Sequence, residues 1–251
     1  MAEKQIVVDD ALINYIDLNP EASKALVFLH GWQSNAAVWN GVLEKLKNNP
    51  VRLLALDFPG FGQSPIPKQA WGVGEYAAMV KKLIEKQELK DVILVGHSFG
   101  GRVAIKLAAA HPEMVQKLVL VDAAGFRNEK IINKLKILAA KTVKPLFALP
   151  VLKQLKEAAY RAVGANDYAA AGPMRAIFVK TINEDLSGYL PKITAQTLLI
   201  WGGKDKETLL AFGQVMNRLI PNSKLVVLEG AGHFSFIDEP EKFTELIHGL
   251  L

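Results

Sequence analysis

The 251-residue sequence predicts an α/β fold: a mostly parallel eight-stranded sheet with helices on both faces and an inserted helical cap. Short aliphatic runs alternate with longer helical patterns, which is typical of a parallel sheet covered on both sides. The runs Ala-Leu-Val-Phe-Leu, Val-Ile-Leu-Val and Leu-Leu-Ile-Trp are apolar at every position, as expected for strands buried on both faces. The alternation stops after Val121 and resumes near Thr197, which indicates an insertion between two strands.

Eight segments are predicted as strands. The first two alternate apolar and polar residues, which predicts an antiparallel hairpin at the entrance to the sheet. In chain order the predicted strands are Gln5–Val8, Leu12–Asp17, Ala25–His30, Arg52–Asp57, Val92–Gly96, Lys117–Val121, Thr197–Trp201 and Lys224–Leu228.

Helical patterns fill the gaps between these strands. The predicted helices are Ala36–Lys47, Val73–Gln87, Ser98–Ala110, Thr208–Leu219 and Pro240–Leu250. In the second helix, apolar residues recur at helical spacing and predict a stripe that packs on the sheet. The stripe consists of Tyr76, Met79, Val80, Leu83 and Ile84.

The insertion predicts a cap. It reads as several helices separated by Pro145, Pro150, Gly164 and Gly172-Pro173, with no comparable strand pattern. We therefore expect residues 1–124 and 192–251 to form one core, and residues 125–191 to form a helical cap after the sixth strand.

Composition limits the classes of function. The chain has no cysteine, which excludes a cysteine nucleophile, thiolate zinc sites and iron–sulfur clusters, and we predict neither metal nor cofactor. No signal peptide or run of about 20 apolar residues is recognised, so we predict a cytoplasmic protein without membrane insertion.

The net charge of +5 is concentrated in one segment. Phe126–Arg161 contains seven Lys and two Arg against two Glu, without aromatic interleaving, and nucleic-acid binding is not predicted. Ile131, Leu135 and Leu138 are expected to pack on the body of the protein; weak association of this basic segment with anionic lipid is the alternative. The oligomeric state, monomer or homodimer, is left open.

The strongest local motif is Gly96-His97-Ser98-Phe99-Gly100-Gly101, between a predicted strand and a predicted helix. Gly-x-Ser-x-Gly in this context lifts the serine out on a sharp turn. Side chains at positions 96 and 100 are expected to clash there. We predict Ser98 as a nucleophile, although the motif alone is also compatible with an ordinary glycine-rich turn.

A serine nucleophile needs a base and a group that orients the base. Among the five histidines, His233 follows the last strand in a loop of small residues, and we predict it as the base. Asp205 follows the strand Thr197–Trp201 and gives the chain order Ser, Asp, His. Asp122, after the preceding strand, is the rival acid; its alternative role is a buried carboxylate that binds loop amides.

The oxyanion of an acyl-transfer reaction needs two donors. We assign them to the backbone amides of Phe99, after the nucleophile, and Trp32, in the loop Leu29-His30-Gly31-Trp32. The Trp32 side chain either lines the acyl pocket or is structural. Phe99 and Phe234 are further candidates for substrate contact.

Together these motifs resemble the α/β-hydrolase superfamily in order and spacing. The resemblance rests on Leu29-His30-Gly31-Trp32 with Trp39, Asp57-Phe58-Pro59-Gly60-Phe61-Gly62-Gln63-Ser64, the Ser98 motif, Trp201-Gly202-Gly203-Lys204-Asp205 and Gly230-Ala231-Gly232-His233-Phe234. It implies the fold and a Ser-His-Asp triad, but no particular substrate.

Some members of the superfamily differ from this chain at the positions that determine their reactions. Members that open epoxides or displace halides carry an aspartate where Ser98 stands. Meta-cleavage C–C hydrolases commonly have Trp where Phe234 stands. Arg102 resembles the Gly-Gly-Arg of the SHCHC synthases, which bind a substrate carboxylate and catalyse an elimination, although their serine follows an aromatic residue rather than His97. We prefer a structural role for Arg102, an ion pair with a carboxylate such as Asp122.

The expected activity is therefore hydrolysis of carboxylic esters with small to medium apolar acyl groups, through an acyl-enzyme on Ser98. Lactone hydrolysis, C–C hydrolysis and elimination are the enzymatic alternatives. A ligand receptor that keeps the triad but turns over slowly is the alternative from another class. The expected partner is a small-molecule ester.

Overall fold

The computed structural model describes residues 3–127, 168 and 170–251. Its centre is a single eight-stranded sheet in the order β1-β2-β4-β3-β5-β6-β7-β8. β2 pairs antiparallel with β1 and β4, and every pairing from β4 to β8 is parallel. All eight predicted strands are present, as β1 Glu3–Val8, β2 Ala11–Leu18, β3 Lys24–Leu29, β4 Arg52–Leu56, β5 Lys90–His97, β6 Lys117–Val121, β7 Gln196–Gly202 and β8 Ser223–Leu228.

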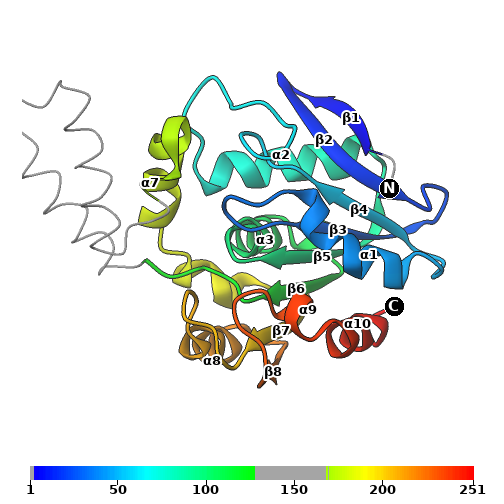
Figure 1. Cartoon of the computed structure of the whole chain (residues 1–251), viewed down its shortest axis with the longest axis vertical. Helices are drawn as coiled ribbons and strands as arrows, with labels where there is room; N and C mark the ends of the chain where they lie inside the picture. Colours follow the sequence, from blue (N-terminus) through cyan, green and yellow to red (C-terminus); the bar gives the residue numbers. More distant parts are fainter. Residues whose placement is uncertain (1–2, 128–167, 169) are drawn as a thin grey trace, which may run out of the picture.

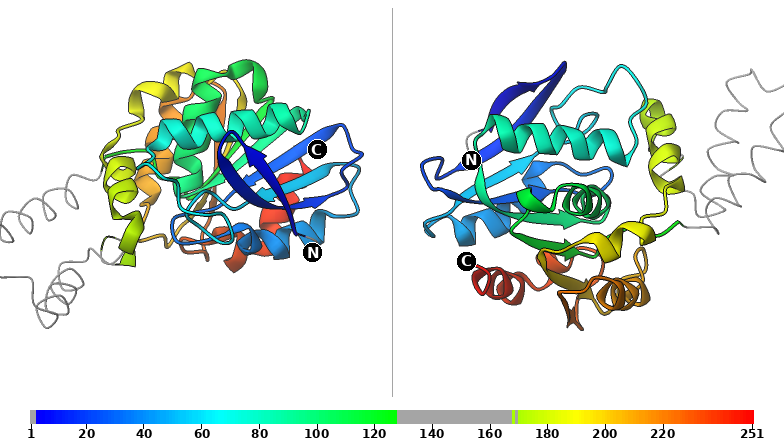
Figure 2. Two further views of the ribbon diagram at one scale, coloured as in Figure 1. Left: turned by 90° about the horizontal axis from the view of Figure 1, so that it is seen from above. Right: turned by 180° about the vertical axis from the view of Figure 1, so that it is seen from behind.

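Helices cover both faces of the sheet (Figures 1 and 2). α2, α3 and α8 pack on one face, and α1 and α10 pack on the other. The described helices are α1 Asn40–Leu46, α2 Val73–Lys86, α3 Phe99–Ala110, α7 Arg175–Asn183, α8 Leu210–Leu219, α9 Ser235–Asp238 and α10 Pro240–His248. The predicted helix Ala36–Lys47 is a 3-10 turn over Ala36–Trp39 followed by α1.

The central strands explain why their sequences are apolar at every position. In β3, Val27 and Leu29 enter the core beneath α2 and α3, whereas Leu26 and Phe28 enter the core beneath α1 and α10. All four are fully buried. The predicted stripe on α2 is buried as expected, because it faces the first of these cores.

The strands β1 and β2 form the predicted antiparallel hairpin. Five consecutive residues of β2, from Ile13 to Asp17, are buried, although polar and apolar residues alternate there. Asn14 Nδ2 donates to Asp57 at 3.0 Å, and Asp17 accepts from Arg52 Nε at 2.9 Å. The polar residues of β2 are therefore buried with partners, which satisfies their hydrogen-bonding groups.

The described regular elements between β6 and β7 are helical. They contain α7 and the 3-10 turns Gly172–Met174 and Ser187–Lys192, and no strand among the residues placed there. The cap boundaries at 125 and 191 stay a prediction. Ile131, Leu135, Leu138, Pro145, Pro150 and Gly164 lie outside the described residues, and so does most of the basic segment. Within the described part of the chain, no helix combines the length and apolarity needed to cross a bilayer.

Candidate active site

Ser98 stands on a strained turn between β5 and α3. Its φ and ψ angles are 49° and −110°, and the positive φ is unusual for a residue with a side chain. Such a conformation costs about 1–3 kcal/mol and persists only where the surroundings hold it. Here Ser98 N donates to Val121 O at 3.1 Å, and Ala124 N donates to Ser98 O at 3.0 Å.

The glycines of the motif are required by backbone contacts. A Cβ at Gly96 would lie 2.6 Å from Gly100 O, and a Cβ at Gly100 would lie 2.3 Å from Leu29 O. These are neighbouring main-chain atoms, which cannot rotate away as a side chain can. A side chain at position 96 or 100 would therefore clash with the main chain, as the sequence predicted.

Asp205 and His233 meet at the carboxyl ends of β7 and β8. Asp205 Oδ2 lies 2.9 Å from His233 Nδ1, and Thr208 Oγ1 donates to the same oxygen at 2.6 Å. Asp205 Oδ1 accepts from the amides of Glu207 and Thr208 at 2.7 and 3.1 Å. Because the carboxylate accepts, His233 Nδ1 carries the proton, and Nε2 is the unprotonated nitrogen when the ring is neutral.

The two groups shift each other's pKa. Burial lowers the pKa of His233, but the hydrogen bond and the charge of Asp205, with Glu207 and Asp122 adding, raise it above its ordinary value. Burial raises the pKa of Asp205, yet its bonds to His233 and Thr208 lower it below the usual range. Asp205 is therefore the charged partner that stabilises an imidazolium on His233.

Asp122, the rival acid, binds loop atoms instead. Its Oδ1 accepts from Gly202 N at 2.7 Å, and its Oδ2 accepts from the Ser235 amide at 3.2 Å and hydroxyl at 2.6 Å. Burial raises the pKa of Asp122 to about 7. It anchors the start of α9, and so supports the loop that carries His233.

His97 packs against His233 and holds its backbone. Its Nε2 lies 2.8 Å from His233 O, and the centroids of the two rings are 4.8 Å apart. Since a carbonyl oxygen only accepts, Nε2 of His97 carries the proton. Burial, with the charge of His233, lowers the pKa of His97 to about 3, so the ring is neutral at neutral pH.

His30 fixes the loop that carries Trp32. Its Nε2 accepts from Phe58 N at 3.0 Å, so Nδ1 carries the proton and donates to Gly31 O at 2.7 Å. In a trans peptide the carbonyl and the following N–H point in opposite directions, so the Trp32 amide points away from His30. Gly31 passes beside the nucleophile, since a Cβ on it would lie 3.3 Å from Ser98 Cβ. Sequence reasoning missed this role of His30.

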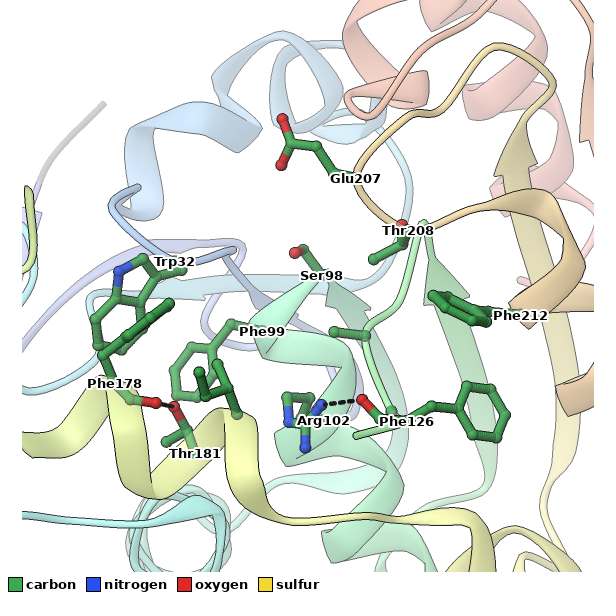
Figure 3. Close-up of a pocket in the computed structure, with 13 residues that line it drawn as sticks. Trp32, Ser98, Phe99, Arg102, Phe126, Phe178, Thr181, Glu207, Thr208 and Phe212 are labelled. Atoms are coloured by element: carbon green, nitrogen blue, oxygen red, sulfur yellow. Dashed lines mark hydrogen bonds between the residues drawn. The ribbon is translucent and has the colours of Figure 1, made fainter. Parts of the chain in front are cut away.

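A cavity opens beside Ser98 (Figure 3). At one end the Trp32 ring lies 5.0 Å from Phe178 and 5.6 Å from Phe99 between centroids. At the other end Phe126 and Phe212 are 5.4 Å apart. Polar atoms in the wall come from Ser98, Arg102, Thr181, Glu207 and Thr208. Ser98 thus lines a mostly apolar space.

Comparison with known proteins places this arrangement in a family. Residues 26–246 match the alpha/beta hydrolase family. The chain belongs to that family. The expected superfamily and the expected fold class are both confirmed.

Relatives within the alpha/beta hydrolase family include esterases. The chain is 30% identical to the pimeloyl-[acyl-carrier protein] methyl ester esterase of Aeromonas hydrophila, over 88% of this chain and 93% of that protein. It is 28% identical to the AB hydrolase superfamily protein YisY of Bacillus subtilis, over 89% and 90%. Among solved structures, an esterase from Exiguobacterium antarcticum superposes with a TM-score of 0.78 at 26% identity, covering 99% of both chains.

Arg102 lines the cavity of this alpha/beta hydrolase but does not pair with Asp122. Its guanidinium donates to the carbonyl oxygens of Phe126, at 3.4 Å, and Glu184, and burial lowers its pKa to about 10. The expected ion pair with Asp122 is wrong because both oxygens of Asp122 bind the Gly202 and Ser235 donors. Within the described residues Arg102 Nε has no hydrogen-bond partner.

Phe234 lies next to the site but outside the described wall of the cavity. It is 37% exposed, and its ring centroid is 5.0 Å from that of His97 and 5.5 Å from that of His233. The sequence interpretation did not identify several residues of the cavity wall, among them Phe126, Phe178, Thr181, Glu207, Thr208 and Phe212. Among residues 3–127, 168 and 170–251, no cluster of three potential metal ligands occurs.

Proposed function

We propose that the protein is a serine hydrolase that cleaves carboxylic esters with small to medium apolar acyl groups. The observation that carries the proposal is the hydrogen bond between Asp205 and His233, at the end of the sheet where the strained turn presents Ser98 to an apolar cavity. A base oriented by a carboxylate is what a serine hydroxyl needs to become nucleophilic.

In the proposed reaction, Ser98 Oγ attacks the ester carbonyl and His233 Nε2 takes its proton. The amides of Phe99 and Trp32 donate to the oxyanion, the second held in direction by His30. Asp205 stabilises the imidazolium, which then protonates the departing alcohol. Water attacks the acyl-enzyme by the same route and releases the acid and free Ser98.

The size of the cavity supports small acyl groups. Its volume is about 140 Å³, and an engineered apolar cavity of about 150 Å³ accepts benzene. The esterases among the relatives support ester cleavage, and lactones, as cyclic esters, are the nearest alternative.

The decisive assay compares wild type, Ser98→Ala and His233→Ala on p-nitrophenyl esters from acetate to decanoate. Each variant is expected to lose about four to six orders of magnitude in kcat. His248→Ala, which alters an exposed histidine on α10, is the matched control and should retain activity. Equal rates in wild type and Ser98→Ala would rule out the acyl-enzyme, and tight ligand binding without turnover would favour the receptor alternative.

Arg102 supports a second candidate, an elimination on a substrate with a carboxylate. It is a cation that is 4% exposed, it lines the cavity, and its described hydrogen bonds go to carbonyl oxygens. Arg102→Met should reduce kcat/KM for monomethyl succinate about tenfold more than for dimethyl succinate, since a hydrogen bond to a charged group contributes about 1.5–3 kcal/mol. An equal effect on both esters would show that Arg102 does not bind a substrate carboxylate, and would remove the observation that favours the elimination.

A further inference from the structure

Glu207 brings a carboxylate to the catalytic histidine from the cavity side. Its amide donates to Asp205 Oδ1 at 2.7 Å, so the loop backbone is attached to the group that orients His233. Its side chain lines the cavity, is 65% exposed, and places Oε2 at 3.3 Å from His233 Nε2.

The contact between Glu207 and His233 Nε2 bears on which leaving groups the site accepts. In the proposed ester hydrolysis, Nε2 passes a proton to the oxygen of the leaving group, so that oxygen must come within hydrogen-bond reach of Nε2. The rest of the leaving group then lies beside Glu207. Figure 3 places Glu207 on the opposite side of Ser98 from Arg102 and Phe178, so the two sides of the nucleophile carry different charges.

The other charged groups around His233 are engaged or face elsewhere. Asp205 binds Nδ1, and Asp122 binds the Gly202 amide and Ser235. His97, which packs against the ring of His233, is neutral. Lys204 and Lys206, on the same loop as Glu207, are exposed and outside the described wall of the cavity. Among the described residues, Glu207 supplies the one carboxylate in the wall of the cavity.

We propose that Glu207 determines the charge of the accepted leaving group: esters of cationic alcohols or thiols are preferred over neutral ones, and anionic ones are disfavoured. The inference rests on the proposed ester hydrolysis. It concerns the alcohol or thiol of the substrate, whereas the cavity beside Ser98 selects the acyl group. The chemistry is unchanged: the acyl bond to the leaving group breaks, and the proton on His233 moves to the leaving atom.

The test uses three acetyl thioesters that differ in the charge of the thiol. Acetylthiocholine is cationic, 3,3-dimethylbutyl thioacetate is its neutral counterpart of the same shape, and S-acetyl-3-mercaptopropanesulfonate is anionic. The chain contains no cysteine, so a thiol reagent reports only the released product. The variants are Glu207→Gln, Glu207→Asp and Glu207→Lys. Glu241→Gln is the control, because it removes an equal charge from an exposed site on α10.

In wild type, kcat/KM for the cationic thioester should exceed that for the neutral one by about three- to fivefold, the upper part of the range expected for an exposed ion pair. Glu207→Gln should bring this ratio close to one, Glu207→Asp should keep part of it, and Glu207→Lys should invert the order. Glu241→Gln should leave the ratio as in wild type. High salt should reduce the wild-type ratio, since exposed charges are screened.

A second readout is the pH dependence on the neutral thioester. Because Glu207 helps to raise the pKa of His233, Glu207→Gln should move the acidic limb of kcat/KM to lower pH. If wild type and Glu207→Gln hydrolyse the neutral thioester and show the same ratio of kcat/KM between the cationic and neutral thioesters, the inference is overturned and the proposed function stands. Absence of hydrolysis of all three by an enzyme that cleaves p-nitrophenyl acetate would also overturn the inference alone. Absence of hydrolysis of the thioesters and of every p-nitrophenyl ester would overturn the proposed function, and the inference with it.

Discussion

At the scale of single residues, the protonation state of His233 controls the proposed reaction. His233 must be neutral to accept the Ser98 proton, and Asp205 raises its pKa above the ordinary value. The rate kcat/KM should therefore rise with pH through that pKa, with a midpoint above about 6.5, and level off beyond it. A pH–rate profile on a neutral ester measures the midpoint.

Asp205→Asn tests the cause of this shift. The amide removes the charge that raises the pKa of His233, so the midpoint should move to lower pH. The amide oxygen should stay with the Glu207 and Thr208 amides, so that the NH2 group faces Nδ1 and favours the wrong tautomer of His233. A change of this kind in a serine protease lowers kcat about 10⁴-fold. Asp122→Asn should retain far more activity. A comparable loss in both variants would contradict the assignment of Asp205.

The sequence predicted the contact between Asp205 and His233 but not the residues that support it. Ser98, Asp205 and His233 each follow a predicted strand, and the ends of parallel strands share one edge of the sheet, so all three could be expected at that edge. The hydrogen bond that fixes the tautomer of His30 comes from Phe58, 28 residues away. The partners of Arg102 come from the segment before β7, whose path no motif fixes.

At the scale of elements, the contact between α3 and β3 sets the position of the nucleophile. Gly100→Ala would place a methyl group 2.3 Å from Leu29 O, and the strands and α3 must separate to admit it. We expect a loss of about 1–3 kcal/mol in the free energy of unfolding, as for overpacked cores. The residual folded protein should also be less active, because the turn at Ser98 moves with α3. Urea denaturation and the ester assay measure both effects.

Gly41→Ala is the matched control. An added Cβ at Gly41, in α1, would meet no atom within 4 Å. The same change there should stabilise the protein by about 0.4–1 kcal/mol, through the unfolded chain. Destabilisation by both substitutions would show that the helices, rather than the contact at Gly100, are sensitive to the added methyl group.

The pattern of apolar residues predicted the burial of the central strands better than the burial of β2. Continuous apolar runs identify β3, β5 and β7 because both faces of these strands are covered. The alternation of β2 predicted the antiparallel hairpin but not the burial of its polar residues, because Asn14 and Asp17 find polar partners in the loop after β4 and on β4 itself. A pattern of hydrophobicity does not report whether a buried polar group has a partner.

At the scale of the whole molecule, the site is assembled from two parts of the chain. The sheet supplies Ser98, Asp205 and His233, and α7, from the insertion, supplies Phe178 against Trp32. The break in the βα rhythm predicted that an insertion exists and that it is helical. It did not predict which face of the insertion reaches the cavity, because several apolar faces are compatible with the sequence.

The contribution of α7 leads to a prediction about substrate length. Phe178 is 5% exposed and forms one end of the cavity, so Phe178→Ala should lengthen it toward Trp32. The optimum in the p-nitrophenyl ester series should then move to longer acyl chains, with kcat/KM for the acetate falling relative to the longer esters. Phe178→Leu should produce a smaller shift in the same direction.

Phe243→Ala separates this effect from lost stability. Phe243 on α10 is fully buried in the core on the other face of the sheet. Truncation of either phenylalanine should cost about 3–5 kcal/mol of unfolding free energy. Only the change at Phe178 alters the wall beside Ser98, so Phe243→Ala should lower the amount of folded enzyme without moving the optimum. An optimum that moves in both variants, or in neither, would mean that α7 does not set the length of the acyl pocket.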